Sequence, residues 1–488
     1  MRQPYERPDR RAFFRTAAAG AVLGPSSLAF AESSPNSEPT TAGVNPATDT
    51  VRGEVLRTSG SLSPDQHRFT ESQREVPVAG RTNVIVCGGG PAGIAAALSA
   101  ARAGADVRLI ELAGCLGGVW TAGLLTKILD SDGKSGIMAE LLTLFSARGS
   151  NVARSTAGTV YDPEVAKLVL EELLVGAGVK ILLHTRVVGA VTNPKNQLAA
   201  IVTESKSGRQ AWVADRFIDC TGDGDLAAQA GCGFELGVGS DCVCQPMSML
   251  ALLTGVDPES VREFIRETAP SAKPKLLELM KTAGINPSYR GPTLRHLHSG
   301  IFSIMTNHEY GVSAFDTEAI TVATIRARRE VHEIVNGLRK LGGVWKDLAV
   351  VATAEQIGVR EGRRIRGRYH VTADDLAKGL RHKEAVCRAA FPIDVHALST
   401  SGNLEIDQSF KKGGLKPYDI PYPALIAADV DGLLMAGRCI SGDFIAHSSY
   451  RVTGNAVAMG EAAGRAAAVS IQKRLLPHEL SWLDVKQA

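Results

Sequence analysis

The chain has 488 residues, of which 44% are hydrophobic and 22% charged, and it contains 50 glycines. This length exceeds the usual size of one domain and the composition can supply a large core, which excludes a small disulfide-stapled scaffold, a collagen-like repeat and disorder for the bulk of the chain. The formal net charge is +3, and the first 31 residues account for it with five arginines and two acids. Because the remainder is neutral overall, its charge gives no reason to expect nucleic acid as a partner and favours a small-molecule substrate.

The amino terminus has the pattern of an export signal. Residues 9–15 read DRRAFFR, and the weakly apolar stretch that follows ends in Ala29-Phe30-Ala31. Paired arginines before such a stretch, with small residues at a cleavage site, resemble a twin-arginine signal. We therefore expect residues 1–31 to be a signal peptide that is read by the twin-arginine export machinery and cleaved after Ala31, which makes the mature protein periplasmic. The stretch is about half the roughly 20 apolar residues that span a bilayer, so we expect no stable membrane insertion.

The folded part of the chain is expected to begin near residue 81. Residues 32–80 are rich in Ser, Pro, Thr and Glu without apolar periodicity, which predicts a poorly ordered spacer. Residues 81–90 then read RTNVIVCGGG, and they are followed by PAGIAAALSAARAG and ADVRLIE. This succession predicts a strand, a tight turn, a helix and a second strand.

The turn carries a dinucleotide-binding pattern. Gly88, Gly90 and Gly93 occupy the three glycine positions of G-x-G-x-x-G, with Pro91 and Ala92 between the last two. The first glycine permits the tight turn, the second lets the backbone approach a pyrophosphate, and the third lets helix and sheet pack closely. The amino end of the helix adds a positive dipole for the same pyrophosphate. We therefore predict that all five residues bind the diphosphate of a dinucleotide.

An acid and three later segments complete the predicted cofactor site. Glu111 ends the second strand about twenty residues after the glycine turn, where it can accept hydrogen bonds from ribose hydroxyls. The motif fits both FAD and NAD, but the segments 111–124, 217–226 and 432–468 favour FAD, because each places glycines directly after an apolar run. The further residues that we expect at the cofactor in the last two segments are Gly222, Asp223, Gly437 and Gly454.

Several segments carry a family resemblance. They are GVREGRRIRGRYHVTADDL at 358–376, FPIDVH at 391–396, KPYDIPYPALI at 416–426 and AGRCIS at 436–441. With the glycine motif, they make residues 81–475 resemble FAD-dependent oxidoreductases of the glutathione-reductase-like fold group. More narrowly, the chain is similar to bacterial flavoproteins grouped with the flavin subunit of heterodisulfide reductase.

The resemblance implies further contacts with FAD. It implies that Gly117 and Gly118 lie beneath the flavin, that the backbone of Val187 contacts adenine, and that Asp443 reaches the ribityl chain. It also implies that the chain is an enzyme, an FAD-dependent oxidoreductase.

The order of elements predicts the fold class. Residues 162–178 have apolar positions at helical spacing, and the apolar runs after them predict strands that cross back to the first sheet. We therefore expect an α/β fold with a Rossmann-like FAD-binding domain that is discontinuous over residues 81–240 and 425–476. An α+β substrate or cap domain is expected to be inserted at residues 241–424.

Eight cysteines raise the question of disulfides and clusters. Cys87, Cys220 and Cys439 each follow an apolar run near a flavin motif, where a small buried thiol fits, so we expect free thiols there. Cys242 and Cys244 are too close in sequence for an unstrained disulfide and lack redox-pair spacing. The heterodisulfide relatives carry iron-sulfur clusters, but no C-x2-C-x2-C run exists here. We expect neither a cluster nor thiol-disulfide chemistry.

Five of the eleven histidines are candidates for a metal site or for chemistry, and they form two groups. His296, His298 and His308 form a loose set without an obvious carboxylate ligand, so we expect no metal site. His396 and His447 lie in family segments that the resemblance places near the isoalloxazine ring. Each is a candidate base, because a neutral imidazole titrates near the working pH.

The leading hypothesis is a periplasmic enzyme that removes a hydride from an alcohol or amine carbon. FAD would accept the hydride while His447 or His396 takes the accompanying proton. Arg451 and Arg360 would neutralise a substrate carboxylate or the anionic reduced flavin. Two alternatives stay open: a flavin-dependent isomerase or β-eliminase acting on a sugar without a net acceptor, and a non-catalytic FAD electron-transfer protein. The physiological electron acceptor is not identified by the sequence.

Export should require both arginines of the pair. The double variant Arg10→Lys plus Arg11→Lys keeps the charge of this segment but removes the twin-arginine signature. We expect the variant to stay in the cytoplasm, as measured by cell fractionation and immunoblotting. Mature protein in the periplasm at the wild-type level would contradict the targeting prediction.

Overall fold

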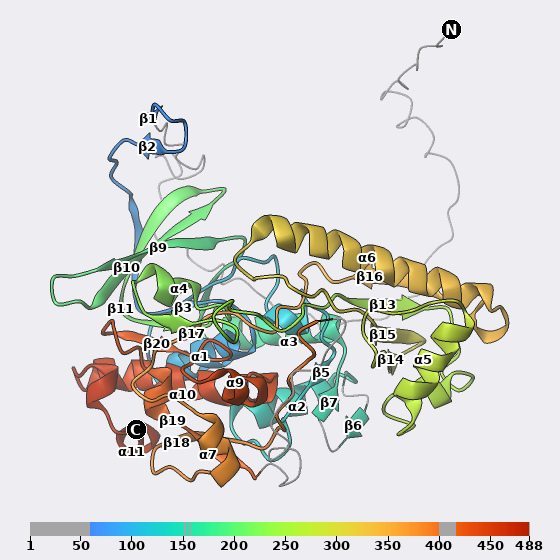
Figure 1. Cartoon of the computed structure of the whole chain (residues 1–488). Coiled ribbons are helices and arrows are strands. Elements are labelled where there is room, and N and C mark those ends of the chain that lie inside the picture. Colours follow the sequence, from blue (N-terminus) through green and yellow to red (C-terminus); the bar gives the residue numbers. More distant parts are fainter. Residues whose placement is uncertain (1–58, 151–152, 156–157, 400–415, 488) are drawn as a thin grey trace, which may run out of the picture. The chain divides into compact units, whose positions relative to one another are not determined.

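The computed structural model describes residues 59–150, 153–155, 158–399 and 416–487 (Figure 1). The expected signal peptide and residues 32–58 of the expected spacer lie outside them. The last part of the spacer is structured, since β1 (Gly60–Leu62) and β2 (Phe69–Glu71) form an exposed antiparallel pair and residues 78–80 belong to the next strand. Within the described residues, no helix combines the length and the hydropathy that a membrane span requires.

A seven-stranded sheet forms the centre of the fold. Four neighbouring strands and one that pairs with them run parallel, and the two strands at one end continue the sheet antiparallel. In sheet order the strands are β8 (Lys180–Leu182), β4 (Val107–Ile110), β3 (Val78–Cys87), β11 (Gly208–Asp219), β10 (Leu198–Ser205) and β9 (Arg186–Thr192), with β20 (Leu433–Met435) also paired to β11. The predicted α/β fold with a parallel Rossmann-like sheet is confirmed.

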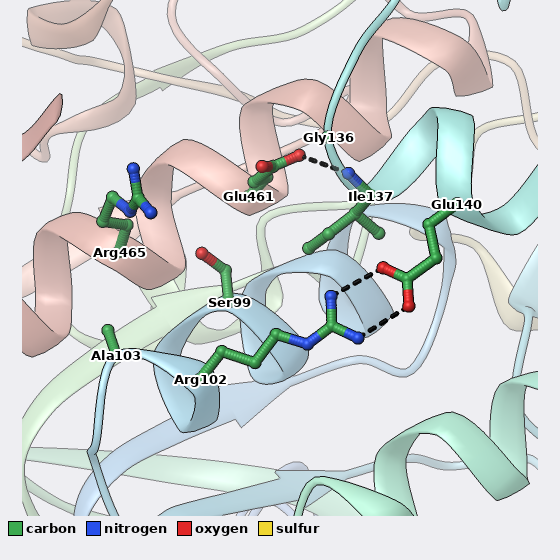
Figure 2. A pocket seen from close by; sticks show the side chains of 8 residues that line it. All are labelled: Ser99, Arg102, Ala103, Gly136, Ile137, Glu140, Glu461 and Arg465. Atoms are coloured by element: carbon green, nitrogen blue, oxygen red, sulfur yellow. Dashed lines mark hydrogen bonds and ion pairs between the residues drawn. The ribbon is translucent and has the colours of Figure 1, made fainter.

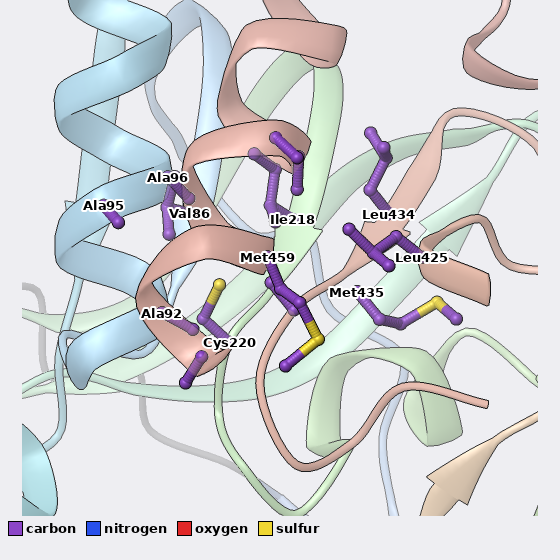
Figure 3. Packing of buried hydrophobic residues seen from close by; sticks show 14 of the residues in the cluster. Val86, Ala92, Ala95, Ala96, Ile218, Cys220, Leu425, Leu434, Met435 and Met459 are labelled. Atoms are coloured by element: carbon purple, nitrogen blue, oxygen red, sulfur yellow. The ribbon is translucent and has the colours of Figure 1, made fainter. Parts of the chain in front are cut away.

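Two helices pack against each other beside this sheet, and their contact depends on glycine. Helix α1 (Pro91–Arg102) follows β3 directly, and α10 (Thr453–Gln472) lies along it (Figure 3). A Cβ atom at Gly460 would lie 2.1 Å from the carbonyl oxygen of Ala92, and one at Gly464 would lie 2.1 Å from that of Ala96. The two backbones are therefore too close for any side chain at these positions.

A second, four-stranded sheet belongs to the inserted region. It has its own core, in which Leu253 and Phe302 of the strands pack with Met280 and Val335 of two helices. Its elements are, in sheet order, β14 (Thr293–His298), β15 (Ile301–Met305), β13 (Leu250–Thr254) and β16 (Ala349–Thr353), with helices α5 (Ala272–Thr282) and α6 (Thr317–Lys340). The expected second α+β body is present.

The chain returns to the first body earlier than the expected boundary at residue 424. Ile365, Val371 and Tyr418 are buried in the core of the seven-stranded sheet rather than in that of the inserted sheet. Strand β17 (Arg364–Ile365) also pairs with β12 (Phe234–Glu235), which precedes the insertion. By these core contacts the inserted body ends before Ile365, because the buried apolar side chains from there on pack in the core of the first sheet.

The remaining elements are short, apart from two longer helices. The strands are β5 (Lys127–Ile128), β6 (Ala153–Ser155), β7 (Gly158–Val160), β18 (Ala385–Ala389) and β19 (Tyr418–Pro421). The helices are α2 (Ile137–Ala147), α3 (Pro163–Gly176), α4 (Asp225–Gln229), α7 (Ala373–Lys378), α9 (Phe444–Tyr450) and α11 (Trp482–Gln487), with 3-10 turns η2 (Gly118–Trp120), η3 (Arg262–Phe264), η4 (Gly343–Trp345), η5 (Tyr422–Leu425) and η6 (Pro477–Glu479).

All eight cysteines lie in the described residues, and each is free. Cys87, Cys220 and Cys439 are buried as expected, and burial raises the pKa of each thiol well above its usual value. A thiol with a raised pKa is a weak nucleophile at neutral pH, so these three side chains act as small packing groups.

The glycine contact between α1 and α10 gives a stability prediction. Gly464→Val forces side-chain atoms against the Ala96 carbonyl, and overpacking of this kind costs about 1–3 kcal/mol or more. Gly176→Ala at the exposed end of α3 is the control, because its added methyl meets no atom within 4 Å. Urea unfolding should show a lower free energy of unfolding only for Gly464→Val. Equal values for the two variants would show that the helices separate easily.

Candidate active site

A cavity of about 920 Å³ lies where the parallel strands end. Its walls come from both bodies, because Gly90 and Glu111 follow strands of the large sheet, whereas Thr293 and Met305 belong to the inserted sheet. Ligands of open parallel sheets bind at the carboxyl ends of the strands, so this position fits a cofactor and a substrate side by side.

The glycine turn shapes one wall of the cavity. Gly88 has a φ of +98°, and a Cβ there would lie 2.4 Å from the carbonyl oxygen of Cys220. A Cβ at Gly93 would lie 1.8 Å from the Gly88 oxygen, so Gly93 permits the close packing of helix and strand and does not itself line the cavity. Gly90 lines it and has no atom within 4 Å of its Cβ position, and Pro91 and Ala92 line it at the start of α1.

The predicted ribose and adenine contacts lie along the same wall. Glu111 follows the end of β4 with only 8% of its surface exposed, and its carboxylate accepts hydrogen bonds from the backbone nitrogens of Gly89 at 2.5 Å and Ala113 at 2.7 Å. Val187 of β9 lines the cavity together with Thr185, which the sequence analysis missed. The acid is therefore held in place at the cavity edge by backbone donors.

Gly117 and Gly118 form a left-handed turn against the glycine motif. The backbone nitrogen of Gly117 donates to the Gly89 oxygen at 2.8 Å, and a Cβ at Gly118 would lie 2.9 Å from the Cα of Gly90. Gly118 lines the cavity, whereas Gly117 lies behind it. The pair thus brings bare backbone to the cavity, which suits a flat ring.

Some of the residues predicted in the two later glycine segments line the cavity. Gly222, Asp223 and Gly437 line it, and Asp223 forms an ion pair with Arg438 at 2.8 Å. A Cβ at Gly222 would collide with that Arg438 guanidinium, which explains the need for glycine there.

Two predicted cofactor residues are not on the cavity. Gly454 packs against the Asp130 carbonyl oxygen, which a Cβ would approach to 2.2 Å. The Asp443 carboxylate accepts hydrogen bonds from the backbone nitrogens of Ala446 at 2.7 Å and Ala373 at 2.6 Å. The structure therefore corrects both assignments, since Gly454 serves close packing and Asp443 caps helix α9.

A polar cluster that also lines the cavity contains three of the four predicted catalytic residues. His396 Nε2 lies 3.2 Å from an Asp394 carboxylate oxygen, and Arg451 Nη2 donates to the Asp394 carbonyl at 2.8 Å. Arg360 donates to Ser248 Oγ at 3.0 Å, and the His396 backbone nitrogen donates to Gln245 Oε1 at 3.1 Å. His396, Arg360, Arg451 and Asp394 all line the cavity.

Burial and charge set the protonation of this cluster. Burial and the nearby Arg360 lower the pKa of His396 to about 4, although the hydrogen bond that its Nε2 donates to Asp394 acts in the opposite direction. Burial would raise the pKa of Asp394, but the His396 hydrogen bond and the two arginines lower it well below its usual value. At neutral pH the imidazole is therefore uncharged and the carboxylate ionised.

His447, the fourth predicted catalytic residue, lies away from the cavity. It is 0% exposed in α9, and its ring meets Tyr450 edge-on with 5.5 Å between ring centroids. Burial and the charges of Arg451 and Arg364 lower its pKa well below the usual value, an effect that the Arg438 main chain only partly offsets. Among the described residues, no side-chain or backbone group makes a well-aligned hydrogen bond to its ring nitrogens. His447 therefore lies in the protein core and not at the substrate cavity.

The three histidines that the sequence marked as a loose set do not converge. His296 packs on Phe302, His298 Nε2 lies 2.6 Å from an Asp162 oxygen, and His308 Nε2 lies 3.3 Å from Arg360. In the part of the chain that the structure describes, no group of three or more His, Cys, Asp or Glu side chains could hold a metal ion.

A second, smaller pocket of about 340 Å³ lies between α1, α2 and α10 (Figure 2). Arg102 forms a two-point ion pair with Glu140 at 2.6 and 2.7 Å, and Glu461 accepts a hydrogen bond from the Ile137 backbone nitrogen at 2.8 Å. Both acids are thus used to join the three helices, and the pocket has a structural role.

The chain belongs to the family of FAD-dependent oxidoreductases, whose family model matches residues 83–488. The cavity fits FAD, since Gly90 leaves open space at the helix start and Glu111 stands at the ribose position. The protein is therefore an FAD-dependent oxidoreductase with FAD as its cofactor.

Several solved structures resemble this chain at low sequence identity. A geranylgeranyl bacteriochlorophyll reductase-like protein from Thermoplasma acidophilum is 13% identical, with a TM-score of 0.45 over 84% of this chain and 82% of that one. The flavin-dependent brominase Bmp2 is 12% identical, with a TM-score of 0.43 over 82% and 81%. The myxobacterial chondrochloren halogenase CndH is 14% identical, with a TM-score of 0.43 over 83% and 78%. A search of curated proteins found no match.

Gly90 gives a direct test of the cofactor site. Gly90→Val points its side chain into the cavity without meeting protein atoms, so the chain should fold but lose most of its FAD. The measurement is the ratio of flavin to protein absorbance after purification. Gly176→Val on exposed α3 is the control and should keep full occupancy. Full flavin occupancy in Gly90→Val would disprove the assignment of the motif.

Proposed function

We propose that the protein is an exported enzyme that removes a hydride from an alcohol or amine carbon of a small organic substrate. The observation that supports this most is one cavity with the dinucleotide turn on one wall and the His396–Asp394 pair on another. FAD, when bound, supplies the hydride acceptor. The protein supplies orientation and a group that takes the substrate proton.

His396 is the proposed base. Its Nε2 faces the Asp394 carboxylate at 3.2 Å, which favours the tautomer with the proton on Nε2 and leaves the Nδ1 lone pair for a substrate proton. Its lowered pKa keeps it uncharged at neutral pH, as a base must be. Asp394 then stabilises the imidazolium that forms when the proton is taken.

Arg360 and Arg451 are proposed to orient the substrate and offset negative charge. Burial and the Arg451 charge lower the pKa of Arg360 to about 10, so it stays cationic at neutral pH. Arg451 also lies 3.3 Å from Gln245 Oε1, the oxygen that holds the His396 backbone. This hydrogen-bond network therefore sets the positions of the base and of Arg451, whereas Arg360 is held by Ser248.

The family segments support this arrangement. FPIDVH contains both Asp394 and His396, and GVREGRR contains Arg360. Segments more than thirty residues apart thus contribute adjoining groups of one cavity, which supports grouping the chain with the flavin subunits of heterodisulfide reductases.

Replacement of His396 should separate chemistry from cofactor binding. His396→Ala removes the base, so the rate of flavin reduction by substrate should fall roughly a hundredfold to ten-thousandfold. FAD content should stay at the wild-type level, because the cofactor contacts lie on the other wall. Stopped-flow absorbance measures the rate, and turnover that depends on an added acceptor dye separates net oxidation from isomerisation.

The matched control is His447→Ala, which changes a buried histidine outside the cavity. In the wild type, the rate should stay constant below neutral pH and then fall through an apparent pKa of about 4, because protonated His396 cannot accept a proton. An unchanged rate in His396→Ala would exclude His396 as the base, and loss of the reaction only in His447→Ala would contradict the placing of His447 outside the mechanism.

A further inference from the structure

The wall of the cavity nearest the inserted sheet is strongly cationic. Lys127 of β5, Lys273 of α5 and Arg295 of β14 line it, and so does Arg266, which precedes α5. The proposed base and its arginines lie on the same cavity, but none of these four side chains has a role in the proposed proton transfer.

One carboxylate, that of Glu267, pairs with two of these four cations. Glu267 forms ion pairs with Arg295 and with Lys127, whose Nζ lies 3.5 Å from Glu267 Oε1. The side chains of Lys127 and Glu267 are each 7% exposed. Lys273 and Arg266 make no ion pair with any acid of the described residues, so positive charge exceeds negative charge on this wall.

The excess positive charge helps to lower the pKa of both lysines. Burial and the charge of Arg295 lower the pKa of Lys127 to about 8. Burial, followed by Arg295 and Arg266, also lowers the pKa of Lys273. Like charges held together in a partly buried wall repel one another, and an anion bound among them would relieve that repulsion.

We propose that this wall binds an anionic group of the substrate, a carboxylate or a phosphate, so that the substrate is a small acid. This inference rests on the proposed function and names its substrate class. Lys273 Nζ lies 6.0 Å from the centre of the Tyr289 ring, which in turn lies 6.1 Å from that of His396. Tyr289 lines the cavity between them. A substrate of a few carbon atoms can therefore place its anion on this wall and its oxidised carbon near His396.

The test is calorimetric titration of the FAD-loaded protein with inorganic phosphate and, separately, with malonate. At least one anion should bind, and Lys273→Gln should weaken that binding tenfold or more, since a contact with a half-buried cation is lost. The control is Lys275→Gln on the same helix, which removes an exposed charge paired with Glu263 at 2.6 Å and should leave the affinity unchanged. Phosphate binding alone would indicate a phosphorylated substrate, and malonate binding alone a carboxylic acid.

Three results would overturn the inference. They are the binding of neither anion, equal affinity in wild type and Lys273→Gln, and an equal loss in Lys275→Gln. A second variant, Arg266→Gln, repeats the test at an exposed position where folding is not at risk.

Flavin bleaching with hydroxy acids and with neutral alcohols separates this inference from the proposed function. If only neutral alcohols reduce the flavin, the anion site fails; if anions bind but no compound reduces it, the proposed function fails.

Discussion

The structure depends on close contact between backbones that only glycine allows. The Gly88 carbonyl lies where a Cβ at Gly93 would be, and α10 approaches α1 through Gly460 and Gly464 in the same way. These contacts hold α1 with its amino end against the cavity. Gly90 then presents open space there, since no protein atom lies within 4 Å of its Cβ position. Cofactor binding thus rests on the packing of small residues more than on any single hydrogen bond.

The charged side chains that line the cavity form separate regions with different functions. The cofactor wall carries Glu111 and an Asp223 that is paired with Arg438, while the facing walls carry mostly cations. His396 lies between an ionised carboxylate and buried arginines, and burial keeps it neutral. The same burial lowers the pKa of Lys127. A neutral base beside a cationic wall is an arrangement suited to an acid that loses a proton and a hydride.

Most of the residues that the sequence assigned to the cofactor line the cavity. The strand, turn and helix around Gly88 follow from local periodicity and glycine spacing. Asp443 was misplaced because an acid after a glycine turn can equally cap the following helix, and only the geometry of α9 separates the two. The insertion boundary was placed too late because no local pattern marks the point where the chain returns to the first body, although Ile365 and Val371 are already buried in its core.

The sequence by itself determined the fold class, the cofactor and its pyrophosphate turn, since these depend on spacing within one supersecondary unit. Tertiary structure alone decided which histidine meets the cavity, because His396 and His447 both lie in family segments and differ only in what packs over them. Tertiary structure also decided which cations meet on one wall of the cavity. Lys127 comes from an element far in the chain from those of Lys273 and Arg295, and no local pattern marks side chains that meet only when two sheets face one cavity.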